Sequence, residues 1–250
     1  MSDRIMIESI PDFPRIEQGH DIGRIIVEHA QRAGIEFQEN DILCVASKAV
    51  STAEGRVISL DDIEVSDVAA EVHKKIPRKD PRAIQVIINE TGALDGSRLE
   101  LDDNYIAGWL PNGMRLTSSG VDKHGIEQVI VLPVDSDASA RAIGETVLAA
   151  TGVNVGVVIT DSDGRVEKRG STQLAIGLYG VPGLRISSVE QDGKVKIAEE
   201  SIADLIAGSA ALLMGQRGTN KPVVLVRGFD YEFDKQSSII DSLSRPGTPK

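Results

Sequence analysis

The chain has 250 residues, of which 38 are acidic and 27 basic, so its formal net charge is −11. This excess of negative charge argues against general binding to nucleic acid or to an anionic membrane surface. The single cysteine, Cys44, excludes a disulfide within the chain and zinc sites built from several cysteines. The N-terminus lacks the apolar block of a signal peptide and no apolar run reaches membrane length, so we expect a cytoplasmic protein.

Helix and strand patterns alternate along the first half of the chain. The predicted elements are a helix from Asp21 to near Gly34, a strand from Asp41 to Ser47, and helices that begin at Ser66 and at Asp80-Pro81. An acid at the cap and a proline at the first helical position are typical of a helix start, and Gly92 is expected to end that last helix.

The second half begins in the same way and then becomes less regular. We predict a strand over residues 127–134, a helix over 138–150 with Gly152 beyond its end, and a strand over 154–160. A long amphipathic helix from Ile202 that stops at Gly215 and a strand over 222–227 follow. The fold class is therefore α+β, a mixed α/β arrangement. We expect residues 1–234 to form a single domain, with two subdomains as the alternative, and residues 235–250 to form a polar C-terminal tail.

The end of the strand over residues 154–160 carries the densest group of polar side chains. Asp161, Ser162, Asp163, Gly164 and Arg165 follow the apolar run in direct succession. A rigid strand end suits catalytic placement, and carboxylates arranged in this way can hold a metal ion. The alternative is that Asp163-Gly164 only makes a tight turn.

Other polar clusters admit similar pairs of interpretations. Ser47 and Lys48 leave the first buried strand and could bind phosphate, or they could be solvated. Asp122 lies in a glycine-flanked loop that is either a ligand loop or an acidic turn. Arg165 and Arg169 form a basic cluster that could hold an anion beside a metal, or be an exposed charged turn.

Residues 214–222, MGQRGTNKP, join a predicted helix to a predicted strand and present polar side chains to any ligand there. The segment is not a P-loop, because the spacing of glycine, lysine and hydroxyl in that motif is absent from the chain. A glycine-rich dinucleotide fingerprint is absent as well.

These segments, in this order, resemble the coenzyme F420-0:L-glutamate ligase family, whose members add glutamate to the side chain of a deazaflavin cofactor. The resemblance spans nearly the whole chain and is carried by FPRIEQGHDI, DILCVASKAVSTAEGR, DPRAIQVIINET, SSGVD, VLPVDSDASA, GVNVGVVITDSDGR, RGSTQLAIGLYGV, ADLIAGSAALLMG and PVVLVRG. It implies an intertwined homodimer that uses GTP, with ATP as the alternative, two divalent cations (Mg²⁺ or Mn²⁺) and potassium. The implied substrates are L-glutamate and the deazaflavin precursor.

The resemblance also implies roles for individual residues. The metal-binding positions are Asp122, Asp161, Ser162 and Gln216. The nucleotide-contacting positions are Phe13, Pro14, Arg15, Ile16, Ser47, Lys48, Met214, Gly215, Gln216, Arg217, Gly218, Thr219, Asn220 and Lys221. Amide formation needs an activated acyl group, which an acyl phosphate provides, and Lys48, Arg165 or Arg169 could steady the phosphates or the incoming carboxylate.

The chain departs from the family pattern at several positions. Gly125 stands where a nucleotide-contacting Asn is typical, and Thr52 where Lys is common, while Gln216 replaces a Glu of some members. The run GRVEKRG, with Glu167, and the reduced segment LRISSVEQDGK fall near the expected acceptor pocket. The alternatives are therefore a ligase for a different carboxylate, a non-catalytic ligand-binding relative and a metal-dependent phosphate hydrolase.

Overall fold

The computed structural model describes residues 4–191, 193–216 and 218–244. In chain order the helices and strands are β1 (Met6–Ser9), α1 (Ile22–Arg32), β2 (Ile42–Ala46), α2 (Ser47–Ala53), β3 (Val57–Ser59), α3 (Asp67–Lys75), α4 (Pro81–Thr91), β4 (Leu99–Asp102), β5 (Tyr105–Trp109), β6 (Arg115–Thr117), β7 (Asp122–Lys123), β8 (Gln128–Ile130), α5 (Ser136–Thr151), β9 (Gly156–Arg165), β10 (Lys168–Tyr179), β11 (Leu184–Gln191), β12 (Lys194–Ser201), α6 (Ile202–Met214) and β13 (Val223–Arg227). The α+β class expected from the sequence is confirmed.

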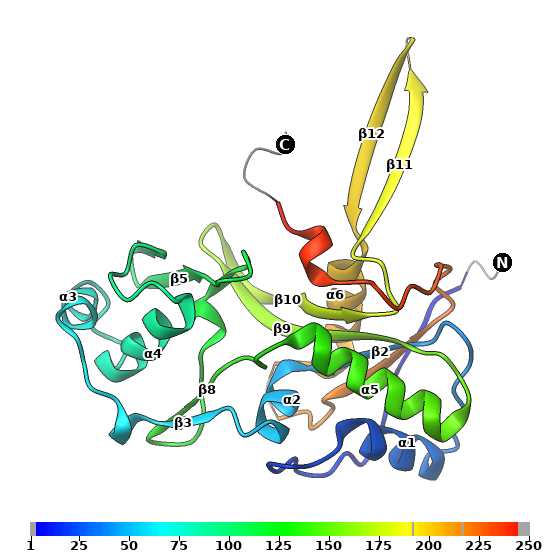
Figure 1. The fold of residues 1–250 in the computed structure, drawn as a ribbon, viewed down its shortest axis with the longest axis horizontal. Helices are drawn as coiled ribbons and strands as arrows, with labels where there is room; N and C mark the ends of the chain where they lie inside the picture. The colour runs from blue at the N-terminus through cyan, green and yellow to red at the C-terminus, as the bar shows by residue number, and fades with distance from the viewer. Residues whose placement is uncertain (1–3, 192, 217, 245–250) are drawn as a thin grey trace.

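A five-stranded sheet with the order β1-β13-β2-β9-β10 forms the centre of the large lobe (Figure 1). Only β2 and β9 are parallel, with Cys44 opposite Val158. Helices α1 and α5 cover one face and α6 the other, so β2 and the first half of β9 are buried on both sides. This double burial explains why both strands are nearly continuous apolar runs. Cys44, the single cysteine of the chain, is fully buried in this sheet.

Residues 57–131 form a small lobe with its own hydrophobic cluster. Helices α3 and α4 pack against two three-stranded sheets, β3-β8-β7 and β4-β5-β6. Most of the large lobe's core comes from the central sheet and its helices. Whether the lobes are independent subdomains stays a prediction, since separate cores do not by themselves show independent folding.

Strands β11 and β12 form a two-stranded ribbon that projects away from both lobes (Figure 1). The sequence between residues 160 and 202 gave no regular pattern, yet the structure has two long antiparallel hairpins there, β9–β10 and β11–β12. The ribbon's side chains are almost all exposed. In β12, Val195 and Ile197 alternate with Lys194 and Lys196, but this run is short and the sequence prediction did not recognise it as a strand.

The capped helices agree closely with the sequence. Asp21, Ser66 and Asp80 are N-caps whose side chains accept from backbone N–H groups, and Gly92 and Gly152 end their helices with positive φ. These positions confirm the predicted starts and stops. None of the helices in the described part of the chain combines the length and apolarity that crossing a bilayer requires.

Two boundaries differ from the sequence expectations. The strand expected to end at Thr160 continues to Arg165, and its hairpin turn is at Val166 and Glu167. The interpretation of Asp163-Gly164 as a tight turn is therefore wrong. The strand expected over residues 127–134 covers only residues 128–130. In the segment after Asp234, Ile239 is buried and packs on the core, and whether residues 235–250 form a tail stays a prediction.

An ion pair between the buried Asp41 and Arg227 joins the neighbouring strands β2 and β13 at one end of the central sheet, and we expect its loss to destabilise the fold. The Arg227 guanidinium donates to both carboxylate oxygens of Asp41 at 2.7 and 2.6 Å, and the Asp41 side chain is 1% exposed. Asp41→Ala should lower the free energy of unfolding by about 3–5 kcal/mol, because it leaves a charge without its partner. Urea unfolding measures this, and Glu28→Gln, in the exposed pair with Arg32, should change it by only about 0.5 kcal/mol. Equal effects would contradict the assignment.

Candidate functional site

A cavity of about 1230 Å³ lies where the C-terminal end of β2 and the adjoining part of β9 face the small lobe. Among the residues proposed from the sequence, those that line it are Pro14, Arg15, Ile16, Ser47, Lys48, Asp122, Asp161, Ser162, Met214, Gly215, Gln216, Gly218, Thr219, Asn220 and Lys221. Segments that are far apart in the sequence therefore meet at one cavity. Arg217 lies outside the described residues.

The parallel pairing of β2 with β9 brings the first two polar groups together. Ala46, the last residue of β2, is opposite Thr160, so Ser47 lies beside Asp161 within β9. The Ser47 hydroxyl donates to Asp161 Oδ1 at 2.7 Å. Because both strands are held in the core, this pair has a fixed position at the cavity wall.

The small lobe contributes the second carboxylate. Asp122 begins β7, and its Oδ2 lies 2.9 Å from Lys48 Nζ. Burial, chiefly, together with the nearby Asp122 carboxylate, raises the pKa of Asp161 to about 7, against the hydrogen bond from Ser47. The two carboxylates are therefore close enough to repel each other, and a cation between them would remove that repulsion.

The chemistry of these donors suits a hard divalent cation. Two carboxylates, the Ser162 hydroxyl and the exposed Gln216 amide all present oxygen at the cavity wall. No group of three or more His, Cys, Asp or Glu side chains with metal-site geometry occurs within the described part of the chain. Mg²⁺ is commonly held by one or two carboxylates together with substrate phosphates, so the set fits such an ion when a nucleotide supplies further oxygens. The metal roles stay predictions.

The loop after α6 forms another wall of the cavity. Helix α6 ends at Met214, and Gly215 follows with φ of 65°, which turns the chain out of the helix. Asn220 Nδ2 donates to the Phe13 carbonyl at 3.0 Å. Phe13 itself is buried in the core and does not line the cavity, so its contribution is to anchor this loop beside the 14–16 segment.

Arg165 and Arg169 are not brought to the cavity. Both are exposed near the end of the β9–β10 hairpin, and neither is among the cavity-lining residues. Asp163 is buried and its Oδ1 accepts from the Thr117 backbone N–H at 2.7 Å, which ties the hairpin to β6. Asp163 therefore joins the two lobes. The catalytic role of Arg165 and Arg169 stays a prediction that their positions do not support.

Sequence reasoning missed Gln173, which lines the cavity from β10. The side chain is 7% exposed and its Oε1 has no hydrogen-bond partner among the described residues. Gln173 is opposite Ser162 in the hairpin register, and only recognition of β10 could have placed it there. Thr52 and Gly125, where the chain departs from the family pattern, also line the cavity.

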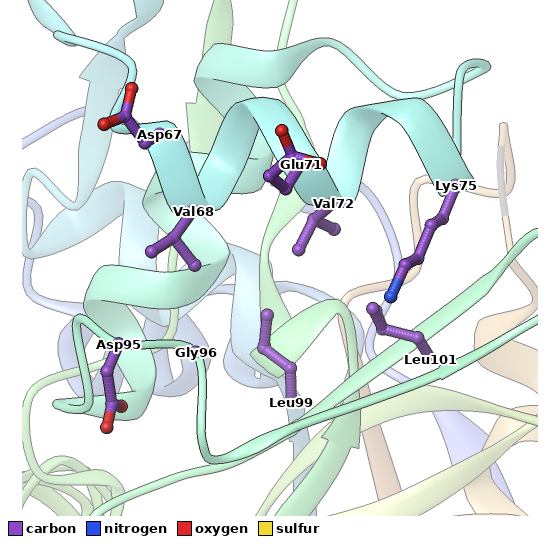
Figure 2. A pocket seen from close by; sticks show the side chains of 9 residues that line it. All are labelled: Asp67, Val68, Glu71, Val72, Lys75, Asp95, Gly96, Leu99 and Leu101. Atoms are coloured by element: carbon purple, nitrogen blue, oxygen red, sulfur yellow. The ribbon is translucent and has the colours of Figure 1, made fainter.

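A smaller hollow of about 350 Å³ lies in the small lobe, between α3 and the segment that leads into β4 (Figure 2). Val68, Val72, Leu99 and Leu101 form its apolar lining, and Asp67, Glu71, Asp95 and Lys75 surround them. None of the residues proposed from the sequence lines it. The large cavity is therefore the candidate site.

An α+β fold in which acidic, hydroxyl and basic groups converge on one large cavity defines an enzyme-like binding site. The family model for F420-0:Gamma-glutamyl ligase matches residues 12–228. Relatives described as coenzyme F420:L-glutamate ligase include those of Methanopyrus kandleri, 35% identical over 96% of this chain and 96% of the relative, and Methanosarcina barkeri, 35% identical over 95% and 91%. A third, from Methanothermobacter thermautotrophicus, is 27% identical over 97% and 96%. The chain belongs to the F420-0:Gamma-glutamyl ligase family.

Proposed function

We propose that this ligase uses GTP to join L-glutamate to the deazaflavin precursor F420-0 through an acyl phosphate. The observation that carries the proposal is the convergence of Ser47, Lys48, Asp122 and Asp161 at the cavity that the 214–221 loop also lines. The full-length family match supplies the reaction class. ATP is the alternative nucleotide, and potassium is a further proposed ion.

The proposed reaction has two steps. A carboxylate oxygen of the acceptor attacks the nucleotide γ-phosphate, the bond to the β-phosphate breaks and GDP leaves. The amino group of glutamate then attacks the acyl carbon, the amide forms, and phosphate leaves as the amine loses its proton. Divalent cations, when bound, would neutralise the phosphates and the charge that develops on them.

The chain's own residues have distinct parts in this scheme. Asp122 and Asp161 would hold the cations, with Ser162 and Gln216 as neutral oxygen donors. Lys48 lines the cavity beside Asp122 and would contact a phosphate oxygen. Ser47 fixes the Asp161 carboxylate through its 2.7 Å hydrogen bond.

Nucleotide binding should depend on divalent metal. The Asp122 and Asp161 carboxylates repel the phosphates of a nucleotide unless a cation lies between them, even though Arg15, Lys48, Lys123 and Lys221 also line the cavity. We expect calorimetry to detect GTP binding with Mg²⁺ and affinity weaker by about 100-fold or more with EDTA. Equally tight GTP binding without metal would contradict the metal dependence and would indicate that Lys48 and Lys221 neutralise the phosphates.

A ligase for a different carboxylate is the second candidate, because the chain departs from the family pattern in GRVEKRG and LRISSVEQDGK, which the resemblance places near the acceptor pocket. The test is GDP release measured with single components omitted. We expect release that requires both glutamate and F420-0. Release that needs glutamate but prefers another carboxylate would favour the second candidate, and release without either substrate would favour a hydrolase.

We also propose that the protein is a homodimer and that the β11–β12 ribbon forms part of its interface. An isolated two-stranded ribbon is at best marginally stable in water. One face of this ribbon carries Ile186, Val195 and Ile197, which are 65, 70 and 68% exposed in the single chain. Covering that face with a second copy would bury apolar surface that the chain itself leaves open.

A further inference from the structure

Lys79 lies in the turn that precedes α4 and does not line the cavity. It has no role in the proposed two-step reaction. Its side chain is partly buried, and its Nζ donates to Ser118 Oγ at 2.9 Å. Ser118 begins the short 3₁₀ segment Ser118–Gly120, which leads through Val121 to Asp122. Lys79 therefore contacts the segment that delivers a proposed metal ligand, although it does not line the cavity.

That segment has a demanding backbone conformation. Ser118 and Ser119 have φ of 54° and 52°, and Gly120 follows with φ of 72°. Side chains with a Cβ rarely adopt this left-handed region, and two in succession persist only where the surroundings enforce them. The turn therefore needs specific contacts to stay in the form that aims Asp122 at the cavity.

Packing supplies one of those contacts and Lys79 the other. Ser119 is 1% exposed and fills the space beside Gly108, where an added Cβ would come within 2.2 Å of Ser119 Oγ. Ser119 Oγ has no hydrogen-bond partner among the described residues, so packing alone holds that side chain. Ser118 is held by the Lys79 ammonium.

The charge of Lys79 also interacts with the Asp122 carboxylate. Burial lowers the pKa of Lys79 and Arg78 lowers it further, whereas the Asp122 carboxylate raises it. Asp122 thus lies near two lysines, since its carboxylate pairs directly with Lys48 at 2.9 Å. Of the two, Lys48 faces the cavity and Lys79 contacts the turn on the small-lobe side.

We infer that Lys79 is a positioning residue that holds the Ser118–Gly120 turn and so places Asp122 for cation binding. The inference rests on the proposed metal role of Asp122. A positioning role and a purely electrostatic role predict opposite changes in cation affinity when Lys79 is replaced. Removing a positive charge near the carboxylates would by itself raise their affinity for a cation, whereas loss of positioning lowers that affinity.

The test is Mn²⁺ binding to the complete protein, first without nucleotide and then with a non-hydrolysable GTP analogue. Binding is followed by the electron paramagnetic resonance of the free ion, with Mn²⁺ and the analogue alone as the baseline. Lys79→Met should weaken binding by about 10- to 100-fold, as removal of a group that orients a ligand does. Ser118→Ala should shift it the same way, and the double variant should be no weaker than Lys79→Met, because both changes break one contact. Lys79→Arg should restore part of the affinity.

Lys74→Met is the matched control, since Lys74 is an exposed lysine of the same lobe, and it should leave Mn²⁺ binding unchanged. Ser118→Ala keeps the inference testable if Lys79→Met does not fold, as judged by thermal unfolding. Unchanged or tighter binding in Ser118→Ala, or in a folded Lys79→Met, would overturn the positioning role. No Mn²⁺ binding by the parent protein, or none lost in Asp122→Asn, would instead overturn the proposed metal site.

Discussion

Replacing Asp161 by Asn should lower kcat by at least about 100-fold, the loss typical when a group that stabilises transition-state charge is removed. The amide keeps the shape of the side chain and can still accept the hydrogen bond from Ser47. It removes the negative charge that a divalent cation needs. The expected result is therefore loss of turnover with little change in the thermal unfolding midpoint.

Asp230→Asn controls for the loss of a carboxylate, because Asp230 is exposed on the segment after β13 and does not line the cavity. Turnover should be measured with Mg²⁺ at limiting and saturating concentrations. The assignment of Asp161 fails if its variant retains parental turnover at limiting Mg²⁺. An unfolding midpoint that falls below the assay temperature would also count against a specific role, because unfolding would then account for the lost activity.

Charges on the apolar face of the ribbon should convert a dimer into monomers. Ile186→Glu together with Ile197→Glu places two carboxylates per chain where we propose a partner contact. Burial of each isoleucine contributes roughly 1.5–3 kcal/mol, and each change occurs twice in a symmetric dimer, so dissociation should increase by about 100-fold or more. Sedimentation velocity across micromolar concentrations measures the change.

The opposite face of the same ribbon provides the matched control. Ser187 and Ala198 are cross-strand neighbours there, so Ser187→Glu with Ala198→Glu adds the same charge to the other side. We expect this variant to weaken the dimer less. A parent protein that sediments as a monomer with ligands present, or equal effects on both faces, would contradict the proposed interface.

Local signals predicted the parts of the fold that depend on local chemistry. The caps at Asp21, Ser66 and Asp80 and the glycines at 92 and 152 satisfy helix ends wherever the helix packs, so sequence alone located them. The buried strand β2 was visible because both of its faces are apolar.

The site needed information that no local signal contains. Residues 47–48 and 161–162 were recognised as strand exits, but their adjacency depends on the parallel β2–β9 register. Gln173 was missed because β10 combines a polar first half with an apolar second half, and the ribbon because the alternation of Val195 and Ile197 with lysines in β12 is short. Asp163 resembled a site residue in sequence, yet its carboxylate is committed to the Thr117 backbone. Long-range pairing, which sequence patterns do not encode directly, decides each of these positions.

The measurement that tests the central claim most directly is the mass of the product formed from F420-0, L-glutamate, GTP and Mg²⁺ by the purified protein. We predict a product heavier than the acceptor by one glutamyl residue, formed together with GDP and phosphate and absent when glutamate or Mg²⁺ is omitted. Release of GDP and phosphate with the acceptor mass unchanged, for F420-0 and for a panel of other carboxylates, would contradict the ligase assignment.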